Sequence, residues 1–123
     1  MIAQAERPRL TLGAVTVTPP PGAFLQATAE GEAALSAAVM EATAGAACIV
    51  DLFAGLGTFA LPLARRAQVH ALEGDAAMVR ALEEGWRGAT GVKPVTAEAR
   101  DLFRRPLEPD ELARFDAAVI DPP

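Results

Sequence analysis

The sequence lacks tyrosine, has one cysteine, and contains no apolar run long enough to span a bilayer. A single cysteine excludes an internal disulfide and any multi-cysteine metal or iron–sulfur site, so no metal site is expected. The N-terminus has no basic segment followed by an apolar stretch, which argues against export. We therefore expect a reduced, cytoplasmic protein without a membrane segment.

The residues that are present indicate one compact module. A chain of 123 residues with 51% hydrophobic residues is long enough for one domain with a buried core. The 16 acidic residues outnumber the 11 basic ones, giving a net charge of −5. This acidic balance weighs against nucleic-acid binding by these residues alone, because phosphate binding needs a basic face.

Short apolar runs alternate with helical patterns from residue 28 onward. The runs predict strands at 48–52, 69–73, 92–96 and 115–120, and the patterns predict helices at 28–43, 59–67 and 76–87, capped in the last two by Thr58 and Asp75. Such alternation produces a parallel sheet with helices on both faces. The predicted fold class is therefore α/β, a doubly wound Rossmann-like sheet.

Two segments differ in character. Residues 1–22 have an extended pattern that ends in Pro19-Pro20-Pro21-Gly22, which predicts an N-terminal connector or hairpin. Residues 23–123 form the predicted sheet domain. Leu102 to Arg114 predicts a loop with one helical turn.

Ligands of a doubly wound sheet bind at the carboxyl ends of the strands, so the residues that follow each strand are the candidates. The first predicted strand runs into a turn that contains Gly55 and Gly57, where backbone can approach a ligand and a helix begins. Glu73 ends the next strand, 18 residues after Gly55. An acid at that position accepts hydrogen bonds from ribose hydroxyls, so the spacing fits a bound nucleoside.

Charge distinguishes two nucleoside cofactors here. NAD would bring a pyrophosphate to the glycine turn, where the carboxylate of Asp51 would repel it. S-adenosyl-L-methionine has no phosphate and carries an ammonium and a sulfonium, which a carboxylate attracts. Asp51 therefore favours S-adenosylmethionine, with NAD as the alternative.

Two further acids follow strands. Asp101 comes shortly after the third predicted strand, where a carboxylate can accept a hydrogen bond from an adenine amine. Asp121 ends the fourth and precedes two prolines, which hold the backbone extended. Such a turn can hold a planar substrate beside a transferable methyl group.

The segments DLFAGLGTFALPLA (51–64), ALEGD (71–75) and FDAAVIDPP (115–123) resemble the class I S-adenosylmethionine-dependent methyltransferases. The segment GAFLQ (22–26), the glycine turn and the final Asp-Pro-Pro most resemble the RNA (uracil-5-)-methyltransferases, which modify rRNA or tRNA. The resemblance covers residues 20–123. It implies that the cofactor is contacted by Gln26, Phe53, Thr58, Glu73, Asp101 and Asp121, in a pocket shaped by Gly55 and Gly57.

The same resemblance implies that a cysteine thiolate attacks uracil and that a base then removes a proton, both from positions downstream of Asp-Pro-Pro. The sequence stops there, with four of the usual seven strands legible, so we expect a fragment without its catalytic nucleophile. Cys48 begins a strand at the opposite end and is expected to be a buried small hydrophobe. His70 is likewise expected to be a packed residue.

Alternatives remain open at this point. The chain is either part of an RNA methyltransferase, part of a methyltransferase for an exocyclic amine of a nucleobase, or a non-catalytic nucleotide-binding module. Arg65-Arg66 and Arg104-Arg105 are short basic pairs of the kind that usually face solvent. The aromatic residues Trp86, Phe103 and Phe115 are expected to pack in the core or between helix and sheet.

Overall fold

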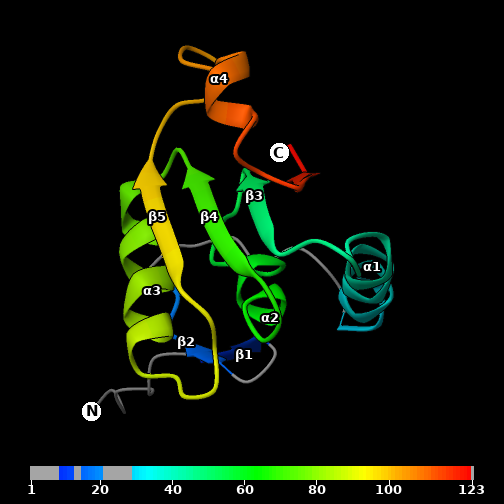
Figure 1. The fold of residues 1–123 in the computed structure, drawn as a ribbon. Helices are drawn as coiled ribbons and strands as arrows, with labels where there is room; N and C mark the ends of the chain where they lie inside the picture. Colours follow the sequence, from blue (N-terminus) through cyan, green and yellow to red (C-terminus); the bar gives the residue numbers. More distant parts are fainter. Residues whose placement is uncertain (1–8, 13–14, 21–28, 123) are drawn as a thin grey trace, which may run out of the picture.

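The computed structural model describes residues 9–12, 15–20 and 29–122. Its centre is a parallel sheet with the strand order β5-β4-β3-β6 (Figure 1). These strands are β3 (Cys48–Leu52), β4 (Gln68–Glu73), β5 (Val95–Ala99) and β6 (Ala117–Ile120). Because the chain moves outward from β3 to β4 and β5 and then returns to the other side of β3, the strand order reverses there. That reversal places a crevice at the carboxyl ends of β3 and β6.

The strand predictions identified all four strands of the sheet, but β6 begins at Ala117, two residues after its predicted start, and β5 is displaced. The β3 prediction is confirmed, and β6 pairs with β3 in parallel, Val50 opposite Ala118. The predicted strand 92–96 was wrong in position, since β5 begins at Val95 and ends at Ala99. Pro94 has no N–H to donate to the ladder, so regular pairing with β4 begins after it.

Within the described ranges, four helices accompany the sheet: α1 (Ala29–Ala42), α2 (Ala60–Leu63), α3 (Ala76–Arg87) and α4 (Pro109–Leu112). The prediction for α3 is confirmed, and the side chain of Asp75 caps it by accepting from the N–H groups of Ala77 and Met78 at 2.8 and 3.3 Å. Acceptors at this position satisfy donors that the first helical turn leaves free.

The prediction for α2 was wrong at both ends. Its N-cap is Phe59 rather than Thr58, and the regular helix ends at Leu63, before a run of turns. Pro62 lacks the N–H that would reach the carbonyl of Thr58, so the helical pattern begins one residue later. The N–H groups of Leu63 and Ala64 make the first consecutive helical bonds, to Phe59 and Ala60 at 3.0 Å each.

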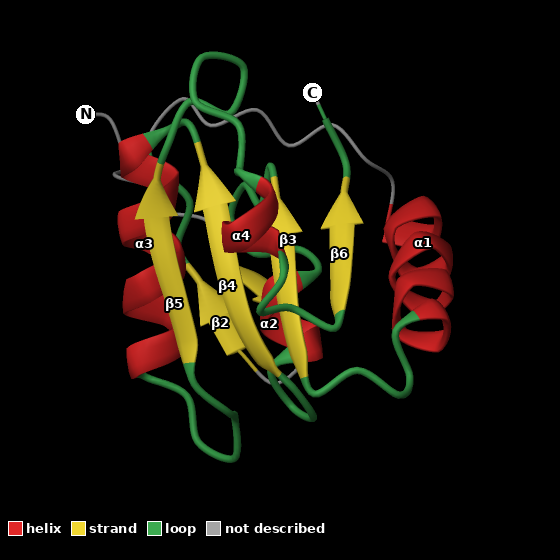
Figure 2. Ribbon diagram, turned by 45° about the horizontal axis from the view of Figure 1, so that its top comes forward, coloured by secondary structure: helices red, strands yellow, loops and turns green. Residues whose placement is uncertain are grey.

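The core lies between one face of the sheet and a layer formed by α2, α3 and a hairpin (Figures 1 and 2). The hairpin consists of β1 (Leu10–Leu12) and β2 (Val15–Val17), paired antiparallel. A Cβ at Gly85 would lie 2.9 Å from Val17, so α3 packs directly against β2. The division of the chain at residue 22 stays a prediction, because residues 21–28 lie outside the described ranges.

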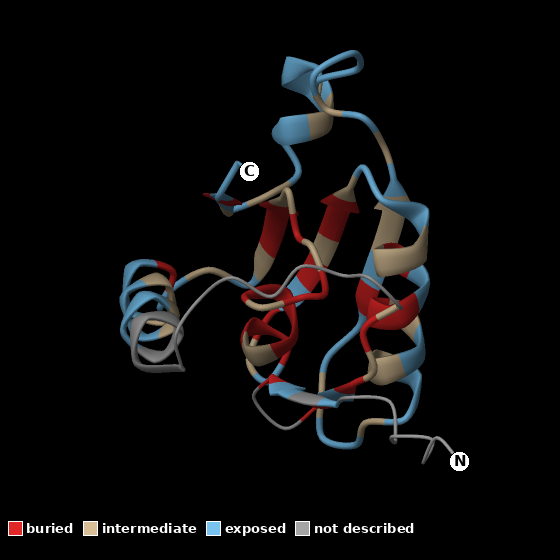
Figure 3. Ribbon diagram, turned by 180° about the vertical axis from the view of Figure 1, so that it is seen from behind, coloured by how far each residue is buried: buried red, intermediate tan, exposed pale blue. Residues whose placement is uncertain are grey.

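Figure 3 shows buried residues concentrated in β3, β4 and α2, and exposed residues in α1 and α4. Helix α1 is attached through Arg66, whose guanidinium donates to the carbonyls of Met40 (2.5 Å) and Thr43 (3.2 Å) and to the Thr43 hydroxyl (2.7 Å). On the opposite face of the sheet, the short α4 is the only helix among the described residues (Figure 2). None of the described helices has the length and apolar content needed to cross a membrane.

Candidate functional site

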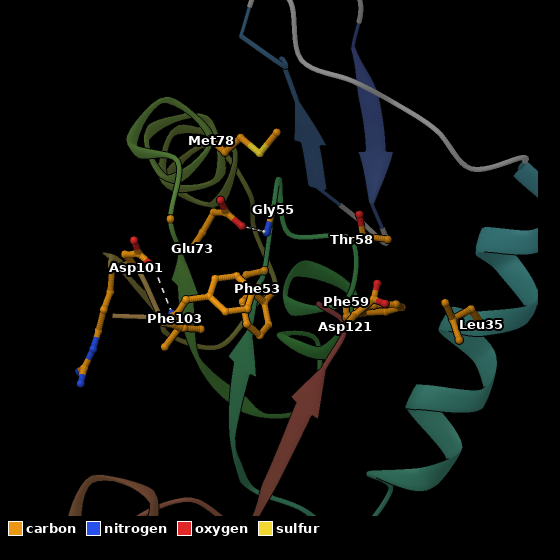
Figure 4. A pocket seen from close by; sticks show the side chains of 14 residues that line it. Leu35, Phe53, Gly55, Thr58, Phe59, Glu73, Met78, Asp101, Phe103 and Asp121 are labelled. Atoms are coloured by element: carbon orange, nitrogen blue, oxygen red, sulfur yellow. Dashed lines mark hydrogen bonds between the residues drawn. The ribbon is translucent and has the colours of Figure 1, made fainter. Parts of the chain in front are cut away.

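A cavity of about 470 Å³ lies at the carboxyl ends of the strands, where the strand order reverses (Figure 4). Its walls come from the turn after β3, the end of β4, the start of α3, the loop after β5, the end of β6 and one residue of α1. Among the residues predicted from the sequence, the cavity is lined by Phe53, Gly55, Thr58, Glu73, Asp101 and Asp121. Segments far apart in the chain thus meet at one cavity.

The turn after β3 is built from backbone in unusual conformations. Phe53 has φ +62°, Gly55 +58° and Gly57 +96°, all in the left-handed region. A non-glycine residue there is strained, and such strain is characteristic of functional turns. A Cβ on Gly57 would lie 2.8 Å from the side chain of Leu61, whereas one on Gly55 would meet nothing within 4 Å. Gly57 therefore allows α2 to pack closely, while Gly55 leaves open space on the cavity side.

Glu73 is fixed by the backbone around it. Its Oε1 accepts from the N–H of Gly55 at 3.1 Å, and its Oε2 accepts from the N–H of Asp75 at 2.7 Å. The carboxylate thus joins the glycine turn to the start of α3 (Figure 4). Each carboxylate oxygen can accept a second hydrogen bond, so both remain available to hydroxyl groups of a ligand.

Asp51 is fully buried beneath the turn and does not line the cavity. Neither of its carboxylate oxygens has a hydrogen-bond partner among the described residues. Burial raises the pKa of Asp51 to about 7, and the negative charges of Asp121 and Glu73 add to this rise. The nearby backbone N–H of Ala60 opposes the rise but does not reach the geometry of a hydrogen bond. A proton or a neighbouring cation stabilises a buried carboxyl group that has no hydrogen-bond partner.

Asp101 organises the loop after β5. Its Oδ1 accepts from the N–H groups of Phe103 (3.0 Å) and Arg104 (3.3 Å), while Oδ2 lies 3.7 Å from Nε of Arg104. Asp101 is exposed and lines the cavity beside Leu102. Its carboxylate therefore both holds the loop and borders the space for a ligand.

Several lining residues were not predicted from the sequence, and the expectation for Phe103 was wrong. That residue was expected in the core, but it is 74% exposed and contacts Phe53 with ring centroids 5.3 Å apart. Its position two residues after Asp101, in a loop that follows a strand, was the signal that could have assigned it to the site. Phe59 before α2 also lines the cavity and lies within the quoted segment 51–64, although no role was assigned to it. Met78 on α3 and Leu35 on α1 line the cavity too, and no motif marked them.

Gln26 lies outside the described residues, so its predicted role stays a prediction. Cys48 is half-buried at the amino end of β3 and lines a different, smaller cavity with His70 and Phe115. The imidazole of His70 lies 2.6 Å from the hydroxyl of Thr96 and stacks on Phe115, and burial lowers its pKa. These contacts agree with a packed histidine. The described residues contain no cluster of three or more metal-ligating side chains.

Curated relatives are similar along the whole chain. An uncharacterized RNA methyltransferase of Rhizobium meliloti is 51% identical over 123 residues, and one of Brucella suis is 50% identical over the same length. The 23S rRNA (uracil(1939)-C(5))-methyltransferase of Chromohalobacter salexigens is 39% identical over 117 residues, which are 93% of this chain and 23% of that protein. The chain spans 30% of the length of the first two relatives. No family model matches it.

Solved structures agree on the fold. The tRNA (uracil-54, C5)-methyltransferase of Pyrococcus abyssi, in complex with S-adenosyl-L-homocysteine, matches 98% of this chain and 29% of its own with a TM-score of 0.76 and 22% identity. The 16S rRNA N2 G1207 methyltransferase of T. thermophilus, in complex with AdoMet and guanosine, matches 89% of this chain and 30% of its own with a TM-score of 0.68 and 32% identity.

The chain has the class I methyltransferase fold. The resemblance to RNA methyltransferases stated from the motifs is also confirmed, since the relatives similar over the whole chain carry that name. In this fold the glycine turn after β3 and the ends of β4, β5 and β6 surround the cavity described above. The site residues themselves are assigned from the geometry of this chain, and their roles follow as a proposal.

Proposed function

We propose that this class I methyltransferase chain binds S-adenosyl-L-methionine in the 470 Å³ cavity and belongs to an enzyme that methylates RNA. The observation that carries the proposal is the fully buried Asp51, which has no hydrogen-bond donor among the described residues and lies beneath the glycine turn. A cationic ligand above that turn would give this carboxylate the partner it lacks. Asp121 and Glu73 add negative charge on the same side.

The charge of the cavity argues against NAD. A pyrophosphate on the glycine turn would lie near Asp51, Glu73 and Asp121, and like charges at short distance in a partly buried site repel strongly. S-adenosylmethionine carries positive charge at its amino group and sulfur. When bound, this cofactor supplies an electrophilic methyl group.

The lining residues divide the cavity into parts. Glu73 would accept hydrogen bonds from the ribose hydroxyls, because its two oxygens are already oriented by Gly55 and Asp75. Asp101 would accept one from the adenine amine. Asp121, at the end of β6, lines the part beside Phe59, where we place the transferable methyl group and the target base. Gln26 remains a predicted contact of the cofactor.

The finer proposal is that the target is carbon 5 of a uridine in rRNA or tRNA, within the cytoplasm. It is supported by the 39% identity to a 23S rRNA uracil-C5 enzyme and by the Asp-Pro-Pro sequence at the end of β6. This reaction needs a thiolate at the target base, and Cys48 lies at the amino end of β3, away from the cavity. The nucleophile would therefore come from outside these 123 residues.

A second candidate has its own support. Methylation of an exocyclic amine needs no thiolate, and the 32% identity to an rRNA N2 methyltransferase extends over 89% of this chain. Analysis of methylated nucleosides after reaction of the longer protein with stable RNA separates the two, because 5-methyluridine and an N-methylated base differ chemically. Recovery of 5-methyluridine supports the uracil proposal, and recovery of an N-methylated base contradicts it.

Cofactor binding is tested on the 123-residue chain itself by calorimetry with S-adenosylhomocysteine, with NADH as the comparison ligand. We expect heat and a raised melting temperature with the first ligand and neither with the second, because binding to the native state stabilises it. A folded sample that shows no heat with S-adenosylhomocysteine at millimolar concentration would contradict the proposal. Binding of NADH instead would favour the nucleotide-binding module.

A further inference from the structure

The loop that follows β5, residues 101–106, presents an unusual set of side chains to solvent. Phe103 is 74% exposed, and Arg104 and Arg105 beside it are also exposed. The exposed ring of Phe103 is thus available to contact another molecule. Two adjacent arginines on a chain with a net charge of −5 make this loop locally basic.

The loop that carries the exposed Phe103 is held by several hydrogen bonds. Oδ1 of Asp101 accepts from the N–H of Phe103 at 3.0 Å, and the carbonyl of Asp101 accepts from the N–H of Arg105 at 2.8 Å. Arg100 fixes the end of the loop, since its Nε and Nη2 donate to the carbonyls of Arg105 (2.7 Å) and Pro106 (2.8 Å). These bonds fix the direction in which the side chains project.

Arg100 is itself held by Glu111 of α4. The two side chains form a paired contact, Nη1 to Oε2 at 2.9 Å and Nη2 to Oε1 at 3.2 Å. Paired arginine–carboxylate contacts of this kind restrict orientation more than a single ion pair does. The contact between Arg100 and Glu111 therefore fixes the loop relative to α4 without a ligand.

The loop also borders the candidate methyl-transfer cavity. The ring of Phe103 lies 5.3 Å from that of Phe53, with 44° between the planes, and both residues line the cavity that Asp121 closes from β6 (Figure 4). A molecule bound in this cavity therefore lies beside the ring of Phe103, and the exposed Arg104 and Arg105 follow that residue in the loop.

We infer that the 101–106 loop binds single-stranded RNA next to the target nucleotide, with Phe103 stacking on a neighbouring base and Arg104 and Arg105 contacting phosphates. An exposed aromatic ring beside arginines is the combination that single-stranded nucleic acid requires, because every base offers a π-face and every linkage a negative charge. Arg105 has no carboxylate partner among the described residues, and Arg104 has only the 3.7 Å contact with Asp101. This inference rests on the proposed function and names the face through which its RNA would enter.

Binding of a fluorescent uridine-rich RNA oligonucleotide to the 123-residue chain at low ionic strength tests the inference. We expect Phe103→Ala to weaken binding about tenfold, since stacking on one base has a value of that order. The double variant Arg104→Gln, Arg105→Gln is expected to weaken binding about tenfold as well and to flatten the salt dependence by roughly one to two phosphate contacts. The matched control is Arg80→Gln, Arg87→Gln on α3, which removes the same charge and is expected to change binding little.

A fluorescence measurement distinguishes base stacking at position 103 from attraction of RNA by charge alone. Phe103→Trp keeps an aromatic ring, so we expect wild-type affinity and quenching of its fluorescence by RNA, above the constant signal of Trp86, whose Nε1 donates to the carbonyl of Lys93 at 3.0 Å. Melting curves of each variant confirm folding. RNA binding that is absent in the wild type, or unchanged in both Phe103→Ala and the double arginine variant, would overturn the inference.

The same variants are titrated with S-adenosylhomocysteine. We expect unchanged affinity in the double arginine variant, because neither Arg104 nor Arg105 lines the cavity. If Phe103→Ala weakens S-adenosylhomocysteine binding and leaves RNA binding intact, the ring covers the purine of the cofactor and the inference is wrong. If the wild type binds RNA through the loop but shows no S-adenosylhomocysteine binding, the proposed function fails while the RNA contact stands.

Discussion

The two loops that line the cavity differ in what they are made of. The turn at residues 53–59 follows β3, is largely buried, and forms its wall from backbone in left-handed conformations. The 101–106 loop follows β5, is exposed, and presents side chains fastened by Asp101 and Arg100. A buried backbone wall suits a cofactor of constant shape, whereas an exposed loop with projecting side chains suits a large flexible substrate. The predictions below test this division of roles.

Substitution of Gly57 is expected to have the largest effect. Gly57→Ala combines a left-handed φ of +96° with a Cβ only 2.8 Å from Leu61, so we expect the free energy of unfolding to fall by about 3 kcal/mol in urea denaturation. Gly55→Ala is the control, because its Cβ meets nothing within 4 Å, and its φ alone costs about 1 kcal/mol. Equal losses in the two variants would show that packing against α2 does not constrain the turn.

Asp51→Asn tests the buried carboxylate. The pKa of Asp51 in the folded chain, about 7, lies above its ordinary value of 3.8, so the unfolded chain ionises first as pH rises. Wild-type stability should therefore fall between about pH 4 and 7, whereas the variant should lack this fall. At pH 8 we expect the variant to be more stable by on the order of 2 kcal/mol, less than the pKa difference implies because a buried amide also lacks partners.

The same variant bears on the ligand. If a cation above the turn is the partner of Asp51, wild-type affinity for S-adenosylhomocysteine, which keeps the amino group, should rise with pH up to about 7, and that of Asp51→Asn should be weaker and independent of pH. Calorimetry at several pH values measures both. Identical pH profiles for the two proteins would separate Asp51 from cofactor binding.

Glu73→Gln should have a smaller effect, confined to the cavity wall. Glutamine has one acceptor oxygen and an NH2 group that only donates, so its two side-chain atoms cannot accept separately from the N–H groups of Gly55 and Asp75. The link between the glycine turn and α3 is therefore weakened, and a ribose acceptor is lost. We expect about a tenfold loss of S-adenosylhomocysteine affinity. Glu41→Gln on exposed α1 is the control, and a comparable loss there would point to overall charge as the cause.

The smallest effect is expected at the brace of the exposed loop. Arg100 holds the pKa of Glu111 down at about 2, so this contact persists through ordinary acidic pH. Glu111→Gln should change the free energy of unfolding little, as for other exposed ion pairs. Hydrogen exchange of the amides of Phe103 and Arg105 should nevertheless accelerate, with the amide of Gly57 unchanged. Faster exchange at Gly57 too would mean that the two loops are coupled.

Local chemistry made some elements predictable. The apolar run of β3 and the capping aspartate before α3 specify those elements without help from distant residues, and both predictions are confirmed. The predicted start of α2 was wrong because Pro62 has no N–H to donate to the carbonyl of Thr58, four residues earlier. The start of β5 was misplaced for a similar reason, since Pro94 cannot enter the ladder with β4.

For the site, the positions of acids and glycines after strands were legible from the sequence, because parallel strands bring their carboxyl ends to one edge. Their environments were not. Burial of Asp51 without a donor, and exposure of Phe103 despite its apolar ring, depend on which distant segments cover each residue. Periodicity within a strand or loop does not contain that information.

The sequence by itself determined the α/β class, the glycine turn and the identity of the charged groups, because these depend on neighbouring residues and on the period of the strands. Only the tertiary structure decided which of those groups share a cavity and how each is solvated. The physical reason is that desolvation and hydrogen bonding arise between segments such as β3, β6 and the loop after β5, which are distant in the chain and meet only in the folded sheet.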